Sequence, residues 1–84
     1  RHFMTEESVK HRIESGLSGA QVQVVDTKGT GDHFSAIVIS DAFEGKNLVK
    51  RHQMVYTTVS DVLTKELHAL QLKTYSCKEW KQEN

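Results

Sequence analysis

The chain has one cysteine, no net charge and no long hydrophobic run. A lone Cys77 cannot form an internal disulfide, so a reducing intracellular compartment fits this composition best. Eleven lysine and arginine residues balance eleven aspartate and glutamate residues, which removes the broad positive field of proteins that mainly grip phosphate backbones. The apolar runs are only a few residues long, so the sequence predicts no membrane span.

The chain is also short and lacks the common catalytic motifs. Its 84 residues suffice for one small domain that buries about 60 to 65% of its unfolded surface, so we expect a surface site rather than a deep cleft. It contains no G-x-S-x-G, C-x-x-C or H-E-x-x-H motif and no phosphate-binding glycine loop, which argues against an enzyme. Residues 1–3 precede Met4, and we interpret them as an expression remnant and residues 4–84 as a single domain.

The spacing of apolar residues predicts an α+β fold with the order α-β-β-α-β-α. Helical elements show one apolar stripe, and strands show alternating or continuous apolar residues. Thr5, Asn47 and Ser76 are the expected N-caps. The expected elements are a helix after Thr5 that ends near Gly16, strands at 21–25 and 33–39, a helix from Asn47 to about Leu67, a strand at 69–73 and a final helical turn at 77–80.

This order brings two histidines toward one edge of the sheet. The first two strands should pair antiparallel, and the second and third should run parallel through a right-handed helical crossover, giving a three-stranded mixed sheet with helices on one face. If the parallel strands are neighbours, they lie about 4.8 Å apart, and His33 and His68 at their starts could share one metal ion or one cluster iron. Cys77 follows the far end of the third strand and is too distant to join them.

Two imidazoles are too few for a closed structural zinc site, which normally has four ligands. Any further ligands would have to come from a partner. A histidine at the end of a strand is also commonly a solvated or hydrogen-bonded polar residue with no metal. Spacing alone leaves both interpretations of His33 and His68 open.

The segments GDHFSAIVIS, FEGKNLVKRHQMVYTTV, ELHALQLKTYS and KEW, taken in order, resemble the BolA family from Met4 onward. The resemblance implies a fold like the class II KH domain and a role beside monothiol glutaredoxins in iron-sulfur trafficking and iron regulation. In that complex a glutaredoxin cysteine and the thiolate of glutathione hold one side of a two-iron, two-sulfur cluster (2Fe-2S). The BolA protein supplies the other side.

The resemblance also assigns ligands residue by residue. The C-terminal ligand in the H-A-L pattern falls on His68, and the ligand from the loop between the first two strands falls on His33 in GDHF, so the chain resembles the histidine-type branch. Imidazole ligands in place of thiolates should raise the cluster potential, and acid should loosen binding. The isolated protein is expected to be a monomer without cofactor, located in the cytoplasm, with the nucleus left open.

Two alternatives remain. A nucleic-acid-binding regulator would use the basic patch at the start of the long helix, formed by Lys46, Lys50, Arg51 and His52. A KH domain clamps the backbone with a GXXG loop, whereas FEGKNL has a single glycine, Gly45. The patch could also be an ordinary solvated face with His52 in a packing role. The third interpretation is an interaction adaptor with no metal.

Overall fold

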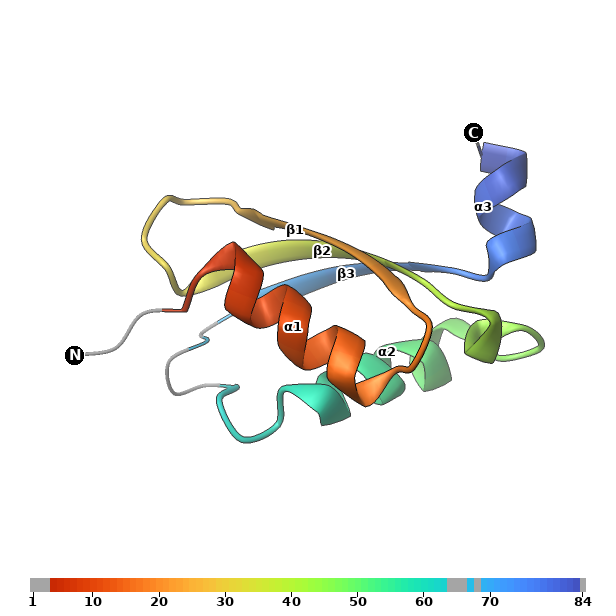
Figure 1. Ribbon diagram of the computed structural model, residues 1–84, viewed down its shortest axis with the longest axis horizontal. Helices are drawn as coiled ribbons and strands as arrows, with labels where there is room; N and C mark the ends of the chain where they lie inside the picture. The colour runs from red at the N-terminus through yellow and green to blue at the C-terminus, as the bar shows by residue number, and fades with distance from the viewer. Residues whose placement is uncertain (1–3, 64–66, 68, 84) are drawn as a thin grey trace.

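The computed structural model describes residues 4–63, 67 and 69–83 (Figure 1). The predicted order of elements is confirmed, with one short 3-10 helix added. The elements are α1 (Glu6–Gly16), β1 (Gln21–Asp26), β2 (His33–Ile39), η1 (Asp41–Phe43), α2 (Leu48–Thr58), β3 (Ala69–Tyr75) and α3 (Cys77–Glu83). Within the described part of the chain, no helix has the length and apolar character needed to cross a membrane.

The three strands form one mixed sheet in the order β1-β2-β3. β1 pairs antiparallel with β2, and β2 pairs parallel with β3, as the connections predict. In the parallel pair His33 lies opposite Ala69, so the first residues of β2 and β3 are level with each other. This register places the beginnings of both strands at one end of the sheet, where the sequence predicts the metal site.

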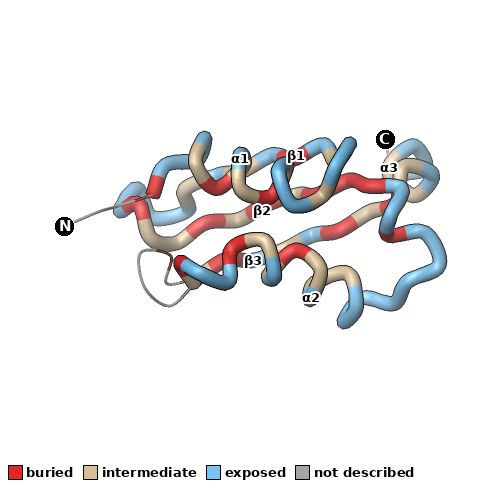
Figure 2. The backbone as a smooth tube through the Cα atoms, turned by 60° about the horizontal axis from the view of Figure 1, so that its bottom comes forward, coloured by how far each residue is buried: buried red, intermediate tan, exposed pale blue. Residues whose placement is uncertain are grey.

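The core lies between the sheet and the two longer helices. α1 and α2 cover one face of the sheet, and α3 lies beyond the end of β3 (Figures 1 and 2). Alternate side chains of the strands point into this core, and no helix among the described residues covers the opposite face of the sheet. The buried residues include Val9 and Ile13 from α1, Phe34, Ala36 and Val38 from β2, Val55 and Val59 from α2 and its cap, and Leu70 from β3.

The predicted caps are present. Thr5 and Ser8 form a reciprocal capping box in which each side-chain oxygen accepts the other residue's backbone N–H at 3.0 Å. The Asn47 side chain accepts the Lys50 N–H at 2.9 Å and starts α2. The Ser76 hydroxyl accepts the Glu79 N–H at 3.2 Å and starts α3. These caps satisfy N–H groups that have no partner inside a helix.

The predicted end of the long helix is wrong. α2 ends at Thr58 instead of continuing to about Leu67. Val59 and Val62 fit the apolar spacing, and both are buried. They lie in consecutive turns in which the N–H groups of Val62 and Leu63 both donate to the carbonyl of Val59. The apolar spacing therefore continues beyond Thr58 through hydrogen-bonded turns, although the regular helix has ended.

Other elements also differ from the prediction: β1 extends by one residue to Asp26, and α3 extends by three residues to Glu83. β3 continues to Tyr75, two residues beyond the predicted strand. The segment after β2 forms the short helix η1, which starts with Ser40 accepting the N–H of Ala42 and inserts Phe43 into the core without solvent exposure. A three-residue helix has no periodicity that a sequence pattern can reveal.

Candidate metal-ligand site at one end of the sheet

His33 is the first residue of β2 and lies on the face of the sheet opposite to the core. Its neighbour Phe34 is buried under the helices, so the alternation of the strand places the His33 side chain on the other face, where 31% of it is exposed. Ala69, level with His33 on β3, directly follows His68 in the sequence. His68 itself lies outside the described residues, so the proximity of the two histidines stays a prediction.

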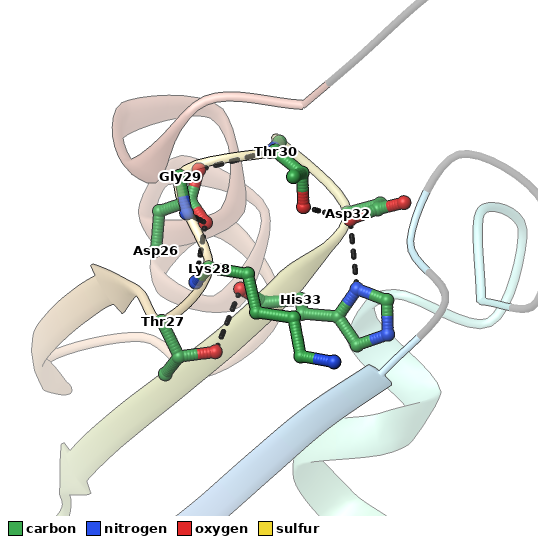
Figure 3. A network of polar contacts seen from close by, with 8 residues as sticks. Asp26, Thr27, Lys28, Gly29, Thr30, Asp32 and His33 are labelled. Atoms are coloured by element: carbon green, nitrogen blue, oxygen red, sulfur yellow. Dashed lines mark hydrogen bonds and ion pairs between the residues drawn. The ribbon is translucent and has the colours of Figure 1, made fainter.

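The loop that precedes His33 is organised around one carboxylate (Figure 3). Asp26 accepts three backbone N–H groups: those of Lys28 at 3.3 Å and Gly29 at 2.8 Å on one oxygen, and that of Gly31 at 2.9 Å on the other. Gly29 and Gly31 have φ angles of 70° and 77°, a region that favours glycine. The two glycines therefore let the chain fold back around Asp26, which fixes the loop in front of His33.

Backbone hydrogen bonds fasten both ends of this loop to the sheet. The Thr27 N–H donates to the carbonyl of His33 at 3.0 Å, which extends the pairing of β1 and β2 by one residue. The Ala69 N–H donates to the carbonyl of Asp32 at 3.1 Å, which joins the end of the loop to the start of β3. His33 is thus held from both neighbouring strands.

The His33 ring contacts a carboxylate through one of its nitrogens. Nδ1 lies 2.7 Å from Oδ1 of Asp32, whose side chain is only 13% exposed. The Thr30 hydroxyl donates to the same oxygen (Figure 3). Histidines that bind metals usually donate their second ring N–H to a carboxylate or carbonyl. The carboxylate of Asp32, as an acceptor for the Nδ1 hydrogen, therefore gives His33 a setting that fits a metal ligand.

One histidine cannot hold a metal alone. Within residues 4–63, 67 and 69–83, no group of three or more histidine, cysteine, aspartate or glutamate side chains could hold a metal ion. Cys77 is separated from His33 by the seven residues of β3, about 20 Å at 3.3 Å per residue. A hydrogen bond to Asp41 raises the pKa of the Cys77 thiol, which disfavours the thiolate form that binds metals. The described residues therefore supply no complete set of ligands around His33, and His68 stays the predicted second ligand from this chain.

The basic patch lies at the other end of the sheet, because α2 begins beyond the C-terminal end of β2 (Figure 1). Arg51 is 12% exposed and contacts Glu79 through two hydrogen bonds of 2.6 and 3.1 Å. Its Nε donates to the Lys46 carbonyl at 2.9 Å, and its guanidinium lies 5.9 Å from the centre of the Phe43 ring. The hydrogen bond to Arg51 is the main cause that lowers the pKa of Glu79 to about 2, and the pKa of Arg51 is raised.

The other members of the patch differ from Arg51. Lys46 and Lys50 are exposed. His52 is half-buried: its ring meets that of Tyr56 edge-on with 6.4 Å between the centres, and its Nε2 is buried without a hydrogen-bond partner. The structure therefore separates His52 from His33 and leaves the two lysines as the exposed cations of the patch.

Sequence reasoning missed three residues that shape the site, namely Asp26, Thr30 and Asp32. An aspartate before a glycine-rich turn is a recognised turn signal, so the role of Asp26 has a trace in the sequence. The carboxylate of Asp32 has none, because its contact with the next residue depends on how the loop folds.

Comparison with known proteins gives consistent matches. The family model of BolA-like protein matches residues 4–79. The DNA-binding transcriptional regulator BolA of Escherichia coli K12 is 32% identical over 85 residues, which cover 93% of this chain and 81% of that protein. Protein BOLA2 of Arabidopsis thaliana is 36% identical over 81 residues, which cover 94% and 86%. The structure of a bolA protein homologue from Coxiella burnetii superposes with a TM-score of 0.78 at 37% identity and covers 94% of this chain and 99% of that one.

Proposed function

This chain belongs to the BolA-like protein family, and on that basis we propose that it is a non-enzymatic partner of a monothiol glutaredoxin. The two proteins share a 2Fe-2S cluster in iron-sulfur trafficking or iron regulation. His33 and His68 are the ligands from this chain. A glutaredoxin cysteine and the thiolate of glutathione are the ligands from the other side.

The observation that carries the proposal is the setting of His33. Its imidazole lies on the face of the sheet opposite to α1 and α2, and its Nδ1 lies 2.7 Å from Oδ1 of Asp32. His33 is paired with Ala69, the first residue of β3, which follows His68 in the sequence. A partner can approach this face without displacing α1 or α2 (Figures 1 and 2). Histidine ligands are compatible with 2Fe-2S clusters, since they replace two cysteines in Rieske centres.

The small number of candidate ligands in the described part of the chain supports a shared cluster rather than a resident one. The described residues contain no group of three or more side chains that could hold a metal ion, and a cluster bridging two proteins needs only half of its ligands from each. The cluster, when bound, would supply electron transfer or be passed on as cargo. The contribution of this chain is to hold and orient its imidazoles.

Anaerobic reconstitution tests the proposal. The protein is mixed with a monothiol glutaredoxin, glutathione, iron and sulfide, and the heterodimer is separated by size and examined by visible absorption and circular dichroism. We expect a coloured heterodimer whose spectrum changes in His33→Ala and His68→Ala. His11→Ala is the matched control, because His11 lies exposed on α1. Identical spectra for wild type and both ligand variants would exclude the ligand assignment.

A second candidate function is nucleic-acid binding. It is favoured by the name of the Escherichia coli relative, a DNA-binding transcriptional regulator, and by the exposed Lys46 and Lys50. Arg51 contributes little to such a surface, since Glu79 already neutralises it. If DNA is bound through phosphates, removal of both lysines should reduce the slope of log affinity against log salt by about 2. An affinity that does not depend on salt would argue against this function.

The remaining alternative, an adaptor without metal, is distinguished by the same reconstitution. It predicts a heterodimer that forms equally well with and without iron and sulfide. The shared-cluster proposal predicts that the coloured heterodimer requires both.

A further inference from the structure

We propose that Asp32 is a positioning residue for the His33 ligand: it selects the tautomer of the ring and fixes the ring relative to β3. This inference rests on the proposed function, because the ligand role of His33 does. Asp32 itself would not touch the cluster.

The first step concerns the proton on the imidazole. A carboxylate accepts hydrogen bonds and has no proton to donate. The contact of 2.7 Å between Asp32 Oδ1 and His33 Nδ1 therefore requires the hydrogen on Nδ1. In the neutral ring the lone pair then resides on Nε2, and Nε2 becomes the nitrogen that can bind iron.

The second step concerns the orientation of the carboxylate. Thr30 donates its hydroxyl hydrogen to the same oxygen that accepts from His33 (Figure 3). The loop that carries both residues is held by three backbone N–H groups on Asp26. A carboxylate fixed by its loop and by a hydroxyl donor confines the ring to a narrow range of orientations. Groups that hydrogen-bond to a metal ligand, without touching the metal, set the orientation of that ligand in this way.

The third step links the two proposed ligand positions. The backbone carbonyl of Asp32 accepts the N–H of Ala69 at 3.1 Å, and Ala69 is the residue after His68 in the sequence. One residue thus holds the His33 ring with its side chain and the start of β3 with its backbone. Substitutions of the Asp32 side chain remove the first contact and leave the second available.

The tautomer can be measured in the free protein. Long-range proton-nitrogen NMR correlations of the imidazole distinguish a protonated from an unprotonated ring nitrogen at constant pH. In wild type we expect hydrogen on Nδ1 of His33. In Asp32→Ala we expect a mixture of tautomers or the reverse tautomer, and Asp32→Leu, which keeps the branched shape of the side chain but has no acceptor oxygen, provides the same test if the alanine variant does not fold. In Thr30→Val we expect a smaller shift in the same direction.

The second readout is the rate at which the glutaredoxin heterodimer loses its cluster. Mutation of a residue that hydrogen-bonds to a metal ligand typically changes metal affinity by about 10- to 100-fold. We therefore expect the heterodimer to lose its cluster at least about 10-fold faster in Asp32→Ala. Asp61→Ala is the matched control, because Asp61 pairs with Arg12 at 2.7 Å on the surface and has a side chain that is 65% exposed. The control should retain both the wild-type tautomer and the wild-type rate.

The two readouts separate failure of this inference from failure of the proposed function. If wild type forms no cluster-bound heterodimer but substitution of Asp32 changes the tautomer of His33, the proposed function fails and the role of Asp32 in orienting the ring stands. If the heterodimer forms but His33 keeps its wild-type tautomer in both Asp32 variants, the inference is overturned. An unchanged rate of cluster loss in those variants would also overturn it.

Discussion

Gly16, the last residue of α1, should not tolerate a methyl group, because α1 and α2 approach closely at this point. A Cβ atom added to Gly16 would lie 2.4 Å from Cγ2 and 2.9 Å from Cβ of Thr58, the last residue of α2. Neither atom of Thr58 is the end of a long flexible side chain. We therefore predict that Gly16→Ala forces the two helices apart and destabilises the protein.

The size of the effect follows from two opposing contributions. Overpacking of a well-packed interface typically costs about 1 to 3 kcal/mol. Alanine gains up to about 1 kcal/mol over glycine in a helix interior, and less at the final residue. The free energy of unfolding should therefore fall by about 1 to 2 kcal/mol. In a domain of this length each kcal/mol lowers Tm by about 4 to 8 °C.

A double-mutant cycle with urea denaturation isolates the contact. Thr58→Ser removes Cγ2 but keeps the hydroxyl that donates to the Val55 carbonyl at 2.6 Å. Gly16→Ala should cost less in the Thr58→Ser background than in wild type, with a coupling energy of about 1 kcal/mol. The reasoning is refuted if Gly16→Ala is neutral or stabilising, or if its cost is the same in both backgrounds.

Three further predictions concern the ion pair, the core and the loop. The hydrogen bond from Arg51 holds the pKa of Glu79 at about 2, below its ordinary value of 4.5, so the pair stabilises the protein above about pH 5 and loses this effect as pH falls toward 2. The Tm of wild type should therefore exceed that of Glu79→Gln near neutral pH but not in acid. A Tm difference that stays constant with pH would contradict this. Phe43→Ala empties a fully buried site and should lower the free energy of unfolding by about 3 to 5 kcal/mol in urea titrations, whereas a loss below about 1 kcal/mol would show that η1 is not packed. Asp26→Ala removes the acceptor of the Gly31 N–H, so hydrogen exchange at Gly31 should accelerate while core amides keep their protection, and unchanged exchange at Gly31 would refute the loop's organisation.

The strands and the first helix could be predicted because burial there coincides with regular geometry. β2 is an example: its β-branched run, apolar on both faces, predicts a central strand, and the structure places it between β1 and β3 with Phe34, Ala36 and Val38 buried. α2 shows the limit of this reasoning. Val62 fits the helical spacing and is buried, but it reaches the core from a turn after the helix has ended.

The candidate site could be predicted only in outline. The topology rules place His33 at a strand start next to the parallel strand, and the register with Ala69 confirms this placement. The contact with Asp32 could not be predicted, because it depends on two positive φ angles and on the hydrogen bonds of Asp26. The internal pairing of Arg51 was equally hidden, since Glu79 lies 28 residues away in the sequence.

Pulsed electron paramagnetic resonance on the reduced, cluster-bound heterodimer tests the shared-cluster proposal most directly. This chain is labelled with ¹⁵N-histidine, and the glutaredoxin and glutathione are left unlabelled. The proposal predicts strong ¹⁵N hyperfine couplings from imidazoles bound to the cluster, and the loss of one coupling in His33→Ala but not in His11→Ala. A cluster spectrum without any ¹⁵N coupling from this chain would contradict it.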